Sequence, residues 1–406
     1  MVAKINADTS GGLKITSDTS GSLEIQSAGT TKFTVSSTGV DIPAIGTING
    51  LTSINGGQIG GRRNLVINGE MKVAQRSTSE TGLGAASGYF TLDRWDMAAG
   101  STAGRFTMAQ VADGPAGFAN CLKLTTTTAD TSIAANEYVV LRQRFEGQDL
   151  QQLKKGTASA EQVTVSFYVK GNAAALYVCE LYDDDNSRSI TQSFAVTTAW
   201  NRIELTFAAD TSDPLDDDNA SSLRLQIWLH AGSTYTSGTF AVNTWNDNTS
   251  ANRYAVADRT SILDSTDRTL SITGVQMELG ATATDFEHRT YADELHSCRR
   301  YCARFTDTAA NNYSASITGT YNTDAVIVAV HTANPPFRAT PTFSFSALSD
   351  FDLEPFDAVP TAMSFFDANQ EFVAIQATDP VSRTRGYAGI ICMDTAGGFF
   401  QFDAEL

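Results

Sequence analysis

The sequence predicts an all-β protein that consists of a short-repeat β arm, an antiparallel jelly-roll sandwich, one short helix and a small C-terminal β-sandwich. Two observations carry this prediction. Segments with alternating apolar and polar residues recur at intervals of roughly ten to fifteen residues, separated by clusters of turn-forming residues. Only one stretch has helical periodicity. Many short strands without intervening helices are typical of an antiparallel sandwich or jelly roll.

Shifts in composition divide the 406 residues into predicted segments. A repetitive arm comes first, a Gly-rich connector follows it, and a helix joins the two sandwiches. The predicted bounds are 1–45 for the arm, 46–63 for the connector, 64–290 for the jelly roll, 291–306 for the linker helix and 307–406 for the C-terminal sandwich.

A ten-residue repeat defines the arm. Ile5, Ile15, Ile25, Val35 and Ile45 are spaced by ten, and three of them close the triplets "LKI", "LEI" and "FTV". Each unit is typical of one short strand with two apolar residues on one face. Such a strand cannot bury that face alone, so the repeats must stack on one another or on other chains. We expect an attachment or trimerisation arm between identical subunits, and the alternative is a small meander packed on its own chain.

The jelly roll is expected to open with "NLVINGEMKVAQR", residues 64–76. Its apolar residues alternate except at Asn68-Gly69, which predicts a first strand with a bend. The segment "LSITGVQMELG", residues 270–280, is expected to close the sheet near it.

Composition excludes several classes of partner. The net charge of −17 and the lack of Lys/Arg clusters argue against nucleic acid and against anionic membranes. No window approaches about 18 apolar residues, so membrane insertion is not expected. The N-terminal "MVAKINADTSGG" lacks a signal-peptide core, which predicts synthesis in the cytoplasm. Five scattered cysteines predict free, buried thiols rather than a disulfide framework.

Five segments resemble, in the same order, strands of the jelly-roll carbohydrate-binding modules attached to glycoside hydrolases. They are "NLVINGEM", "YVVLRQRFEG", "VTVSFYVKGN", "WNRIELTFA" and "LSITGVQMELG". The resemblance runs from the predicted first strand to the predicted last strand. It implies a jelly roll that binds glycans.

A second resemblance is to the body of bacteriophage tail-fibre and related virion appendage proteins. It rests on "RRNLVINGEMKVAQRS", "GYFTLDRWDM" and "VQMELGATATDFEHRTYADELHSCRRY", whose motifs recur in this order in that family. Asp285 stands where the family often has proline. The matching residues are Asn68, Gly69, Met71, Ala74, Gln75, Arg76, Asp93, Arg94, Trp95, Gln276, Glu278, Gly280, Phe286, Glu287, His288, Arg289 and Tyr301.

The second resemblance implies a structural fibre on the tail or head of a tailed bacteriophage, made in the host cytoplasm and located on the virion. The expected partners are identical subunits in a trimer, other virion proteins and host-surface glycan, to which many weak sites presented together would adhere. One alternative is a decoration or connector protein that binds only virion proteins. A second alternative is a polysaccharide depolymerase, although no Walker loop, nucleophile elbow or zinc-protease helix supports an enzyme.

Charged residues within these motifs have two interpretations. Asp93-Arg94 and Glu287-His288-Arg289 place opposite charges side by side. Buried polar groups need partners, and the planar fork of arginine suits carboxylates, so an ion network at the sandwich ends is expected. Catalysis by His288 with a carboxylate is the weaker hypothesis, because no serine or cysteine nucleophile motif accompanies it.

The helical stretch is "YADELHSCRRYCARF". Tyr291, Leu295, Cys298, Cys302 and Phe305 are spaced 4, 3, 4, 3, which predicts an apolar stripe. The stripe is expected to pack on the chain's own domains, and a threefold axis is the alternative. The two cysteines and a nearby histidine offer too few ligands for a metal site, so core cysteines are expected and no metal is predicted.

Two acidic "DDDN" runs, residues 183–186 and 216–219, could hold a structural calcium ion, because calcium prefers carboxylate oxygens. Neither run has the glycine and the distant glutamate of an EF-hand loop. Solvated turns are expected instead, and no cofactor is predicted.

Glycan binding needs exposed aromatic rings and polar side chains that hydrogen-bond to hydroxyl groups. The long polar loop over residues 231–260 offers both. The alternative is that its rings pin the loop to the sandwich or are buried at a subunit contact. The candidate glycan-binding residues are Tyr235, Trp245, Tyr254, Asn246 and Asp247.

The C-terminal segment again alternates between strand and turn patterns and predicts a small β-sandwich. By the resemblance to fibres it would form a tip that trimerises or touches the host. The final "GGFFQFDAEL" contains three phenylalanines and is predicted to be a subunit-contact strand.

Overall fold

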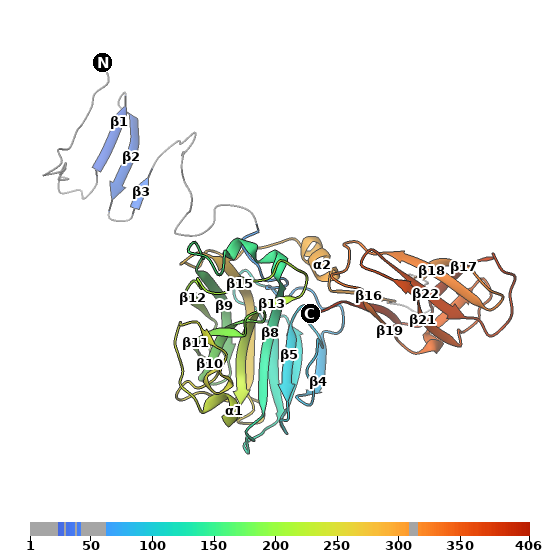
Figure 1. Cartoon of the computed structure of the whole chain (residues 1–406), viewed down its shortest axis with the longest axis horizontal. Coiled ribbons are helices and arrows are strands. Elements are labelled where there is room, and N and C mark those ends of the chain that lie inside the picture. Colours follow the sequence, from blue (N-terminus) through green and yellow to red (C-terminus); the bar gives the residue numbers. More distant parts are fainter. Residues whose placement is uncertain (1–22, 28–29, 37–38, 42–61, 308–315) are drawn as a thin grey trace. The chain divides into compact units, whose positions relative to one another are not determined.

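The computed structural model divides the chain into two compact units, Met1–Ile54 and Asn55–Leu406 (Figure 1). Strands dominate both, which confirms the predicted all-β class. No described helix has the length and apolar character needed to cross a bilayer. The described residues are 23–27, 30–36, 39–41, 62–307 and 316–406.

The first unit contains an antiparallel three-stranded sheet with the order β1-β2-β3. Two of the predicted triplets pair within it, because Leu23 lies opposite Val35 and Ile25 opposite Phe33. The triplet "LKI" and the predicted connector up to residue 61 lie outside the described residues. The role of the arm in trimerisation therefore stays a prediction. The strands are β1 (Leu23–Ser27), β2 (Thr30–Ser36) and β3 (Gly39–Asp41).

The jelly roll consists of two six-stranded antiparallel sheets (Figure 1). The first has the order β14-β11-β10-β13-β8-β5, with bounds Asn246–Asp247, Arg188–Val196, Ala175–Asp183, Ser221–Ala231, Tyr138–Glu146 and Asp96–Gly100. The second has the order β12-β9-β15-β7-β6-β4, with bounds Asn201–Phe207, Val163–Gly171, Thr269–Leu279, Cys121–Thr128, Arg105–Val111 and Ser79–Leu83. Short helical turns lie between strands at η1 (Gly147–Asp149), η2 (Gln151–Leu153), α1 (Ser233–Thr236) and η3 (Ser250–Asn252).

The C-terminal sandwich also has two sheets, as predicted. The smaller has the order β16-β24-β19, with bounds Cys302–Thr306, Phe399–Asp403 and Thr342–Phe345. The larger has the order β20-β23-β17-β18-β22-β21, with bounds Phe351–Glu354, Ala388–Met393, Ser316–Tyr321, Val326–Thr332, Phe372–Thr378 and Ala362–Ala368. One turn, η4 (Leu348–Asp350), precedes β20, and helix α2 (Tyr291–Arg299) precedes β16.

Alternation along the strands builds the core of the jelly roll. In β9 the side chains of Val165, Phe167 and Val169 are fully buried, and Phe167 meets Phe194 of the opposite sheet edge to face with ring centroids 5.0 Å apart. Each such side chain contributes about 1.5–3 kcal/mol to folding when fully buried. The five cysteines are free and buried, as predicted.

The predicted first strand over residues 64–76 is wrong, because this segment is irregular. It nevertheless lies beside β15, as expected: Leu65 N donates to Met277 O (2.9 Å) and Val275 N donates to Gly69 O (3.0 Å). The amide of Gln143 from β8 bonds both backbone groups of Ile67 at 2.8 Å. The segment thus bonds both sheets instead of extending one.

The left-handed backbone of Asn68 (φ 59°) explains why no strand forms there. Its side-chain oxygen accepts from Val73 N (2.9 Å), and its Nδ2 donates to Val73 O (2.8 Å) and Asp93 O (3.0 Å). Trp95 Nε1 donates to the carbonyl of Asn68 (3.0 Å). Buried backbone groups need partners, and this side chain supplies three of them. The motif residues therefore form a hydrogen-bonded structural turn around Asn68, in line with the scaffold interpretation.

The predicted linker helix over 291–306 is too long. Helix α2 ends at Arg299, and Cys302–Thr306 forms strand β16, which pairs with β24. The predicted stripe is therefore interrupted: Cys298 is buried against Ile67, Val73 and Tyr301, whereas Tyr291 is exposed. Edge pairing of β16 in the C-terminal sheet outweighs the local helical pattern.

The phenylalanines of the last strand, which is predicted to contact another subunit, pack within their own chain, and the subunit contact stays a prediction. In β24, Phe400 and Phe402 are buried in the C-terminal core, where Phe402 packs on Phe343 (5.5 Å). Phe399 is half-buried beneath the guanidinium of Arg304, 3.6 Å from the ring centroid. Pairing of β24 with both β16 and β19 places these rings inside their own chain.

Replacing Asn68 tests the contribution of this hydrogen-bonded turn to stability. We expect Asn68→Ala to lower the free energy of unfolding by about 3 kcal/mol or more, because three buried backbone groups lose their partner. Asn68→Gly loses the same bonds but tolerates the left-handed backbone, so it should be more stable than Asn68→Ala. Urea denaturation measures both, and a wild-type midpoint for Asn68→Ala would contradict the assignment.

Candidate functional site

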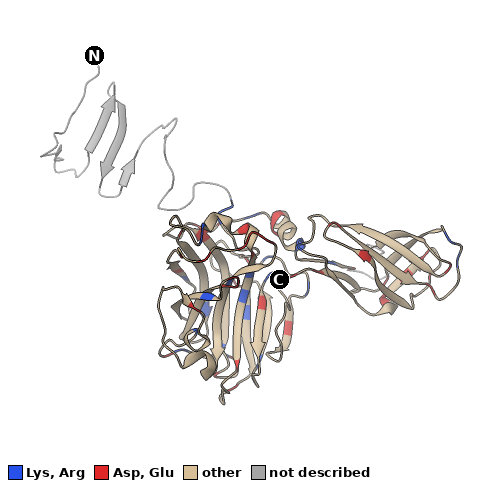
Figure 2. Cartoon of the chain, in the orientation of Figure 1, with Lys and Arg blue, Asp and Glu red and all other residues tan. Residues whose placement is uncertain are grey.

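The outer face of the β5-β8-β13-β10-β11 sheet carries the candidate site. Strands β8 and β13 alternate, so Leu141 and Leu225 point into the core and are fully buried. Arg142, Arg144 and Arg224 occupy the alternate positions and therefore point outward. Figure 2 shows blue Lys and Arg segments on this part of the sheet.

Cross-strand register arranges the outward side chains in two rows. Residues directly opposite each other on neighbouring strands share a face. The first row is Asp96, Arg142, Gln226 and Glu180, and the second is Arg144, Arg224 and Tyr182.

The three arginines Arg142, Arg144 and Arg224, here called the arginine patch, remain partly open to solvent. Their side chains are 14%, 21% and 25% exposed. Arg142 pairs with Asp96, and Arg224 Nε donates to Asp184 (2.7 Å). Two carboxylates thus face three guanidinium groups.

Arg144 is the least compensated member of the patch. Its Nη2 lies 3.8 Å from Asp96, a carboxylate that already pairs with Arg142, and its buried Nε has no hydrogen-bond partner. Burial lowers the pKa of the Arg144 guanidinium, and the charges of Arg142 and Arg224 lower this pKa further. The charged form of Arg144 is therefore held in unfavourable surroundings.

Arg253, from the loop that follows β13, covers the adjoining part of the face. It holds Glu180 in a two-pronged ion pair, with Nε and Nη2 each 2.8 Å from a carboxylate oxygen. Its guanidinium lies over the rings of Tyr182 (4.6 Å) and Trp228 (4.8 Å). Trp228 Nε1 also donates to Glu180 (2.6 Å). Glu180 and Trp228 are therefore occupied by the chain itself, whereas Tyr182 remains partly exposed.

Two of the predicted glycan-binding residues pin the loop. Tyr254 is 1% exposed, and its hydroxyl donates to Thr260 O (2.6 Å). Its ring is buried beside Trp228, with centroids 6.2 Å apart, so it offers no stacking surface as placed. Tyr235 is half-buried between Trp228 (5.2 Å) and Tyr138 (5.6 Å). The geometry of both rings fits the alternative in which they pack on the sandwich.

The other predicted residues lie elsewhere on the loop. Trp245 is half-buried, donates from Nε1 to Ala208 O (2.8 Å) and lies 5.3 Å from the Lys155 amine. Asn246 and Asp247 are exposed in the short edge strand β14. The structure therefore does not bring the five predicted residues together into one site.

Sequence reasoning missed the arginine patch, although a signal was present. Arg142 and Arg144 in "YVVLRQRFE", and Arg224 and Gln226 in "SSLRLQIWLHA", are each two residues apart. That spacing places them on one strand face. What the pattern could not reveal is that β8 and β13 are neighbours, because they lie far apart in the sequence.

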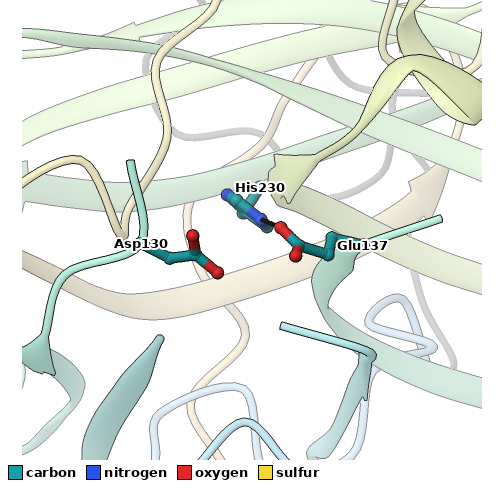
Figure 3. Close-up of side chains that lie close together, drawn as sticks. All are labelled: Asp130, Glu137 and His230. Atoms are coloured by element: carbon teal, nitrogen blue, oxygen red, sulfur yellow. Dashed lines mark hydrogen bonds and ion pairs between the residues drawn. The ribbon is translucent and has the colours of Figure 1, made fainter. Parts of the chain in front are cut away.

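One cluster of potential metal ligands occurs within the described ranges. Asp130, Glu137 and His230 are buried, with ligand atoms within 4.8 Å of one another (Figure 3). Ser261 Oγ accepts from Leu263 N (3.0 Å), so its proton is free to go to His230 Nδ1 (2.7 Å). The ring proton then sits on Nε2, which faces Glu137 (3.4 Å).

The cluster has the hydrogen bonds of a structural anchor. One oxygen of Asp130 accepts from Thr102 Oγ1 (2.9 Å), Ala103 N (2.8 Å) and Gly104 N (3.2 Å). A cation bound here would have to displace the Nε2 proton from His230. The network joins the start of β8 to the end of β13, and the covering loop begins after β13.

The acidic run at 183–186 is also engaged by the chain's own groups. Asp183 pairs with Lys155 (2.5 Å), Asp184 pairs with Arg224, and Asp185 accepts from the backbone of Asp216 (2.9 Å). These three carboxylates are therefore already bonded to a lysine, an arginine and a backbone N–H. The residues of the second run, 216–218, are exposed.

The charged motifs at the sandwich end form ion pairs. His288 bonds Glu70, which also pairs with Lys72. Arg289 bonds the carbonyl of Asn64 and lies 3.4 Å from Glu287. These contacts agree with the scaffold interpretation of the motif. Asp93-Arg94 belongs to a separate network that reaches the C-terminus.

No protein-family model and no curated protein matches the sequence. Among solved structures, the chain is similar to the enzymatically active domain of bacteriophage CBA120 tailspike protein 4, with 12% identity over 53% of this chain and 21% of that chain and a TM-score of 0.29. It thus spans about one fifth of that tailspike chain.

Carbohydrate-binding modules are similar at the same level. The family 11 module of a Clostridium thermocellum cellulase has 14% identity over 51% of this chain and 100% of that chain, with a TM-score of 0.25. The module TmCBM61, in complex with β-1,4-galactotriose, has 9% identity over 53% and 99%, with a TM-score of 0.27. Likenesses this weak carry no argument about function.

The buried His230 predicts a loss of stability in acid. Burial lowers its pKa, although Glu137 and Asp130 act in the opposite direction. In the unfolded chain the pKa of this histidine is about 6.5. Below that pH the unfolded chain binds a proton more readily than the folded chain does, so the free energy of unfolding falls as the pH drops.

We expect the stability advantage of wild type over His230→Gln to shrink as the pH falls below about 6.5. Urea denaturation between neutral pH and mild acid measures it. The exposed His296 provides the matched control, because His296→Gln should give a curve parallel to wild type. A gap between wild type and His230→Gln that does not change with pH would contradict this account.

Proposed function

We propose that this chain is a fibre protein of a tailed bacteriophage virion that adheres, without enzymatic activity, to saccharides on the host surface. The outer sheet face around Tyr182 is the proposed contact surface. The observation that carries the proposal is the row in which Arg144, Arg224 and Tyr182 stand side by side on three neighbouring strands and remain partly exposed.

Planar side chains on a rigid sheet suit saccharide recognition. Arginine forks can donate to neighbouring hydroxyl groups, and the exposed part of Tyr182 can contact a sugar beside the guanidinium groups that lie over its ring. Because the residues lie on strands, their geometry is held before binding, which reduces the entropic cost of association. The sequence resemblance to carbohydrate-binding modules and to virion fibres supports the same assignment.

Adhesion without cleavage fits the surroundings of the face. Glu180, which lies on the same face of β10 as Tyr182, is paired with Arg253. Asp96 and Asp184 likewise form ion pairs with arginines. A glycosidase needs a free acid and a free base or nucleophile, and these carboxylates are held as ion-pair partners.

Removing the ring of Tyr182 tests the binding surface. We expect Tyr182→Ala to weaken binding to host surface polysaccharide about tenfold, because a tyrosine at the centre of a contact contributes on the order of 1–2 kcal/mol. Tyr387→Ala removes an exposed ring from the C-terminal sandwich and is the control.

Surface plasmon resonance on immobilised host polysaccharide gives the affinities, and reducing-end release reports cleavage. Loss of binding in Tyr182→Ala alone supports the proposal. No saccharide binding by wild type would favour a connector that binds only virion proteins. New reducing ends would favour a depolymerase.

The repeat arm is proposed to trimerise the chain. We expect light scattering to give a trimer for the full chain and a monomer after removal of residues 1–61, because short strands with one apolar face bury it by association. A monomer in both cases would refute the trimeric fibre.

A further inference from the structure

We propose that the saccharide is acidic and that its carboxylate binds the arginine patch at Arg144 and Arg224. This inference rests on the proposed function and specifies its ligand. It follows from the charges on the face, since the rings alone would serve neutral sugars equally well.

Like charges oppose one another at the centre of the patch. Arg144 of β8 lies directly across from Arg224 of β13, and Arg142 lies on the diagonal. Directly opposed like charges on neighbouring strands destabilise a sheet. The fold therefore retains an arrangement that lowers its own stability.

The compensation of this charge is incomplete. Asp96 pairs with Arg142, and Asp184 pairs with Arg224. The carboxylate that Arg144 approaches is Asp96, which lies 3.8 Å from its Nη2 and is already paired with Arg142. Glu180 cannot help, because Arg253 already holds both of its oxygens. The patch has three positive charges, and its two aspartate partners have two negative charges. One excess positive charge remains, on a chain whose net charge is −17.

A bound anion supplies the missing partner. A carboxylate accepts two parallel bonds from a guanidinium, and such charge-assisted bonds are roughly twice as strong as neutral ones. A neutral hydroxyl would leave the repulsion between Arg144 and Arg224 in place. Tyr182 is next to Arg224 in the same row, lies under its guanidinium and is partly exposed, so it borders the carboxylate that Arg224 would bind.

The acidic surface elsewhere does not prevent this contact. At physiological ionic strength charges are screened beyond about 8 Å, so the patch acts on groups that lie against it. The same surface disfavours long, densely charged polymers such as nucleic acid. An acidic saccharide, with charges spaced by sugar rings, suits the patch better.

The test compares ligands that differ only in charge, using the full chain. Oligogalacturonate is measured against its methyl ester, and dextran sulfate against dextran, by isothermal titration calorimetry at low and at high salt. A single-stranded DNA oligonucleotide reports general binding of polyanions. We expect oligogalacturonate to bind about tenfold or more tightly than its ester, and added salt to weaken it.

Two variants locate the contact. Arg144→Gln removes a guanidinium whose Nε has no hydrogen-bond partner and whose contact with Asp96 is long (3.8 Å), so it should fold about as stably as wild type. Both Arg144→Gln and Arg224→Gln should weaken oligogalacturonate about tenfold. Arg105→Gln on β6 of the other sheet makes the same charge change and should bind as wild type does.

The outcomes separate the two proposals. Equal binding of oligogalacturonate and its ester overturns the acidic ligand and leaves saccharide adhesion standing. Binding of dextran sulfate alone identifies sulfate as the anionic group at the same patch. Binding of DNA as tightly as oligogalacturonate, or of neither anionic saccharide, overturns the inference. Failure of wild type to bind any saccharide, host polysaccharide included, removes the proposed function itself.

Discussion

The buried guanidinium of Arg94 is the contact on which the association of the two sandwiches depends. Its side chain is 1% exposed, ion-pairs with Glu405, donates to the Arg144 carbonyl (2.5 Å) and lies over the ring of Tyr301 (3.5 Å). Removing one partner of a buried ion pair costs about 3–5 kcal/mol, because the other charge is left uncompensated. Arg94 thereby joins the last residues of the chain to β8, the strand that carries two arginines of the patch.

The residues of the opening motif act mainly in this architecture. Asn68 closes the irregular opening segment, and Arg76 joins it to Asp403 (2.8 Å) in the C-terminal sandwich. Burial raises the pKa of Asp93 to about 6, while Arg76 partly opposes this shift. None of these residues lies in the arginine patch.

Local patterns predicted the elements better than their partners. Alternation located β8, β9, β13 and β15, but residues 64–76 also alternate and form no strand, because Asn68 and Met71 adopt left-handed backbone angles. The heptad-like stripe extended the helix past Arg299, where sheet pairing ends it. The aromatic residues of the loop were predicted either to bind glycan or to pin the loop to the sandwich, and Tyr254 does the second, because the outer face of β13 presents Trp228 to it.

The sequence by itself determined the all-β class, the ten-residue repeat, the free buried cysteines and the neighbourhood of residues 65–69 and 275–277, because periodicity and composition are local properties of the chain. Only the tertiary structure decided where charge accumulates. Arg144 and Arg224 are 80 residues apart and become opposed solely through the register of β8 with β13. Register is set by which faces the whole sandwich buries, so no local pattern in either strand could place the two guanidinium groups together.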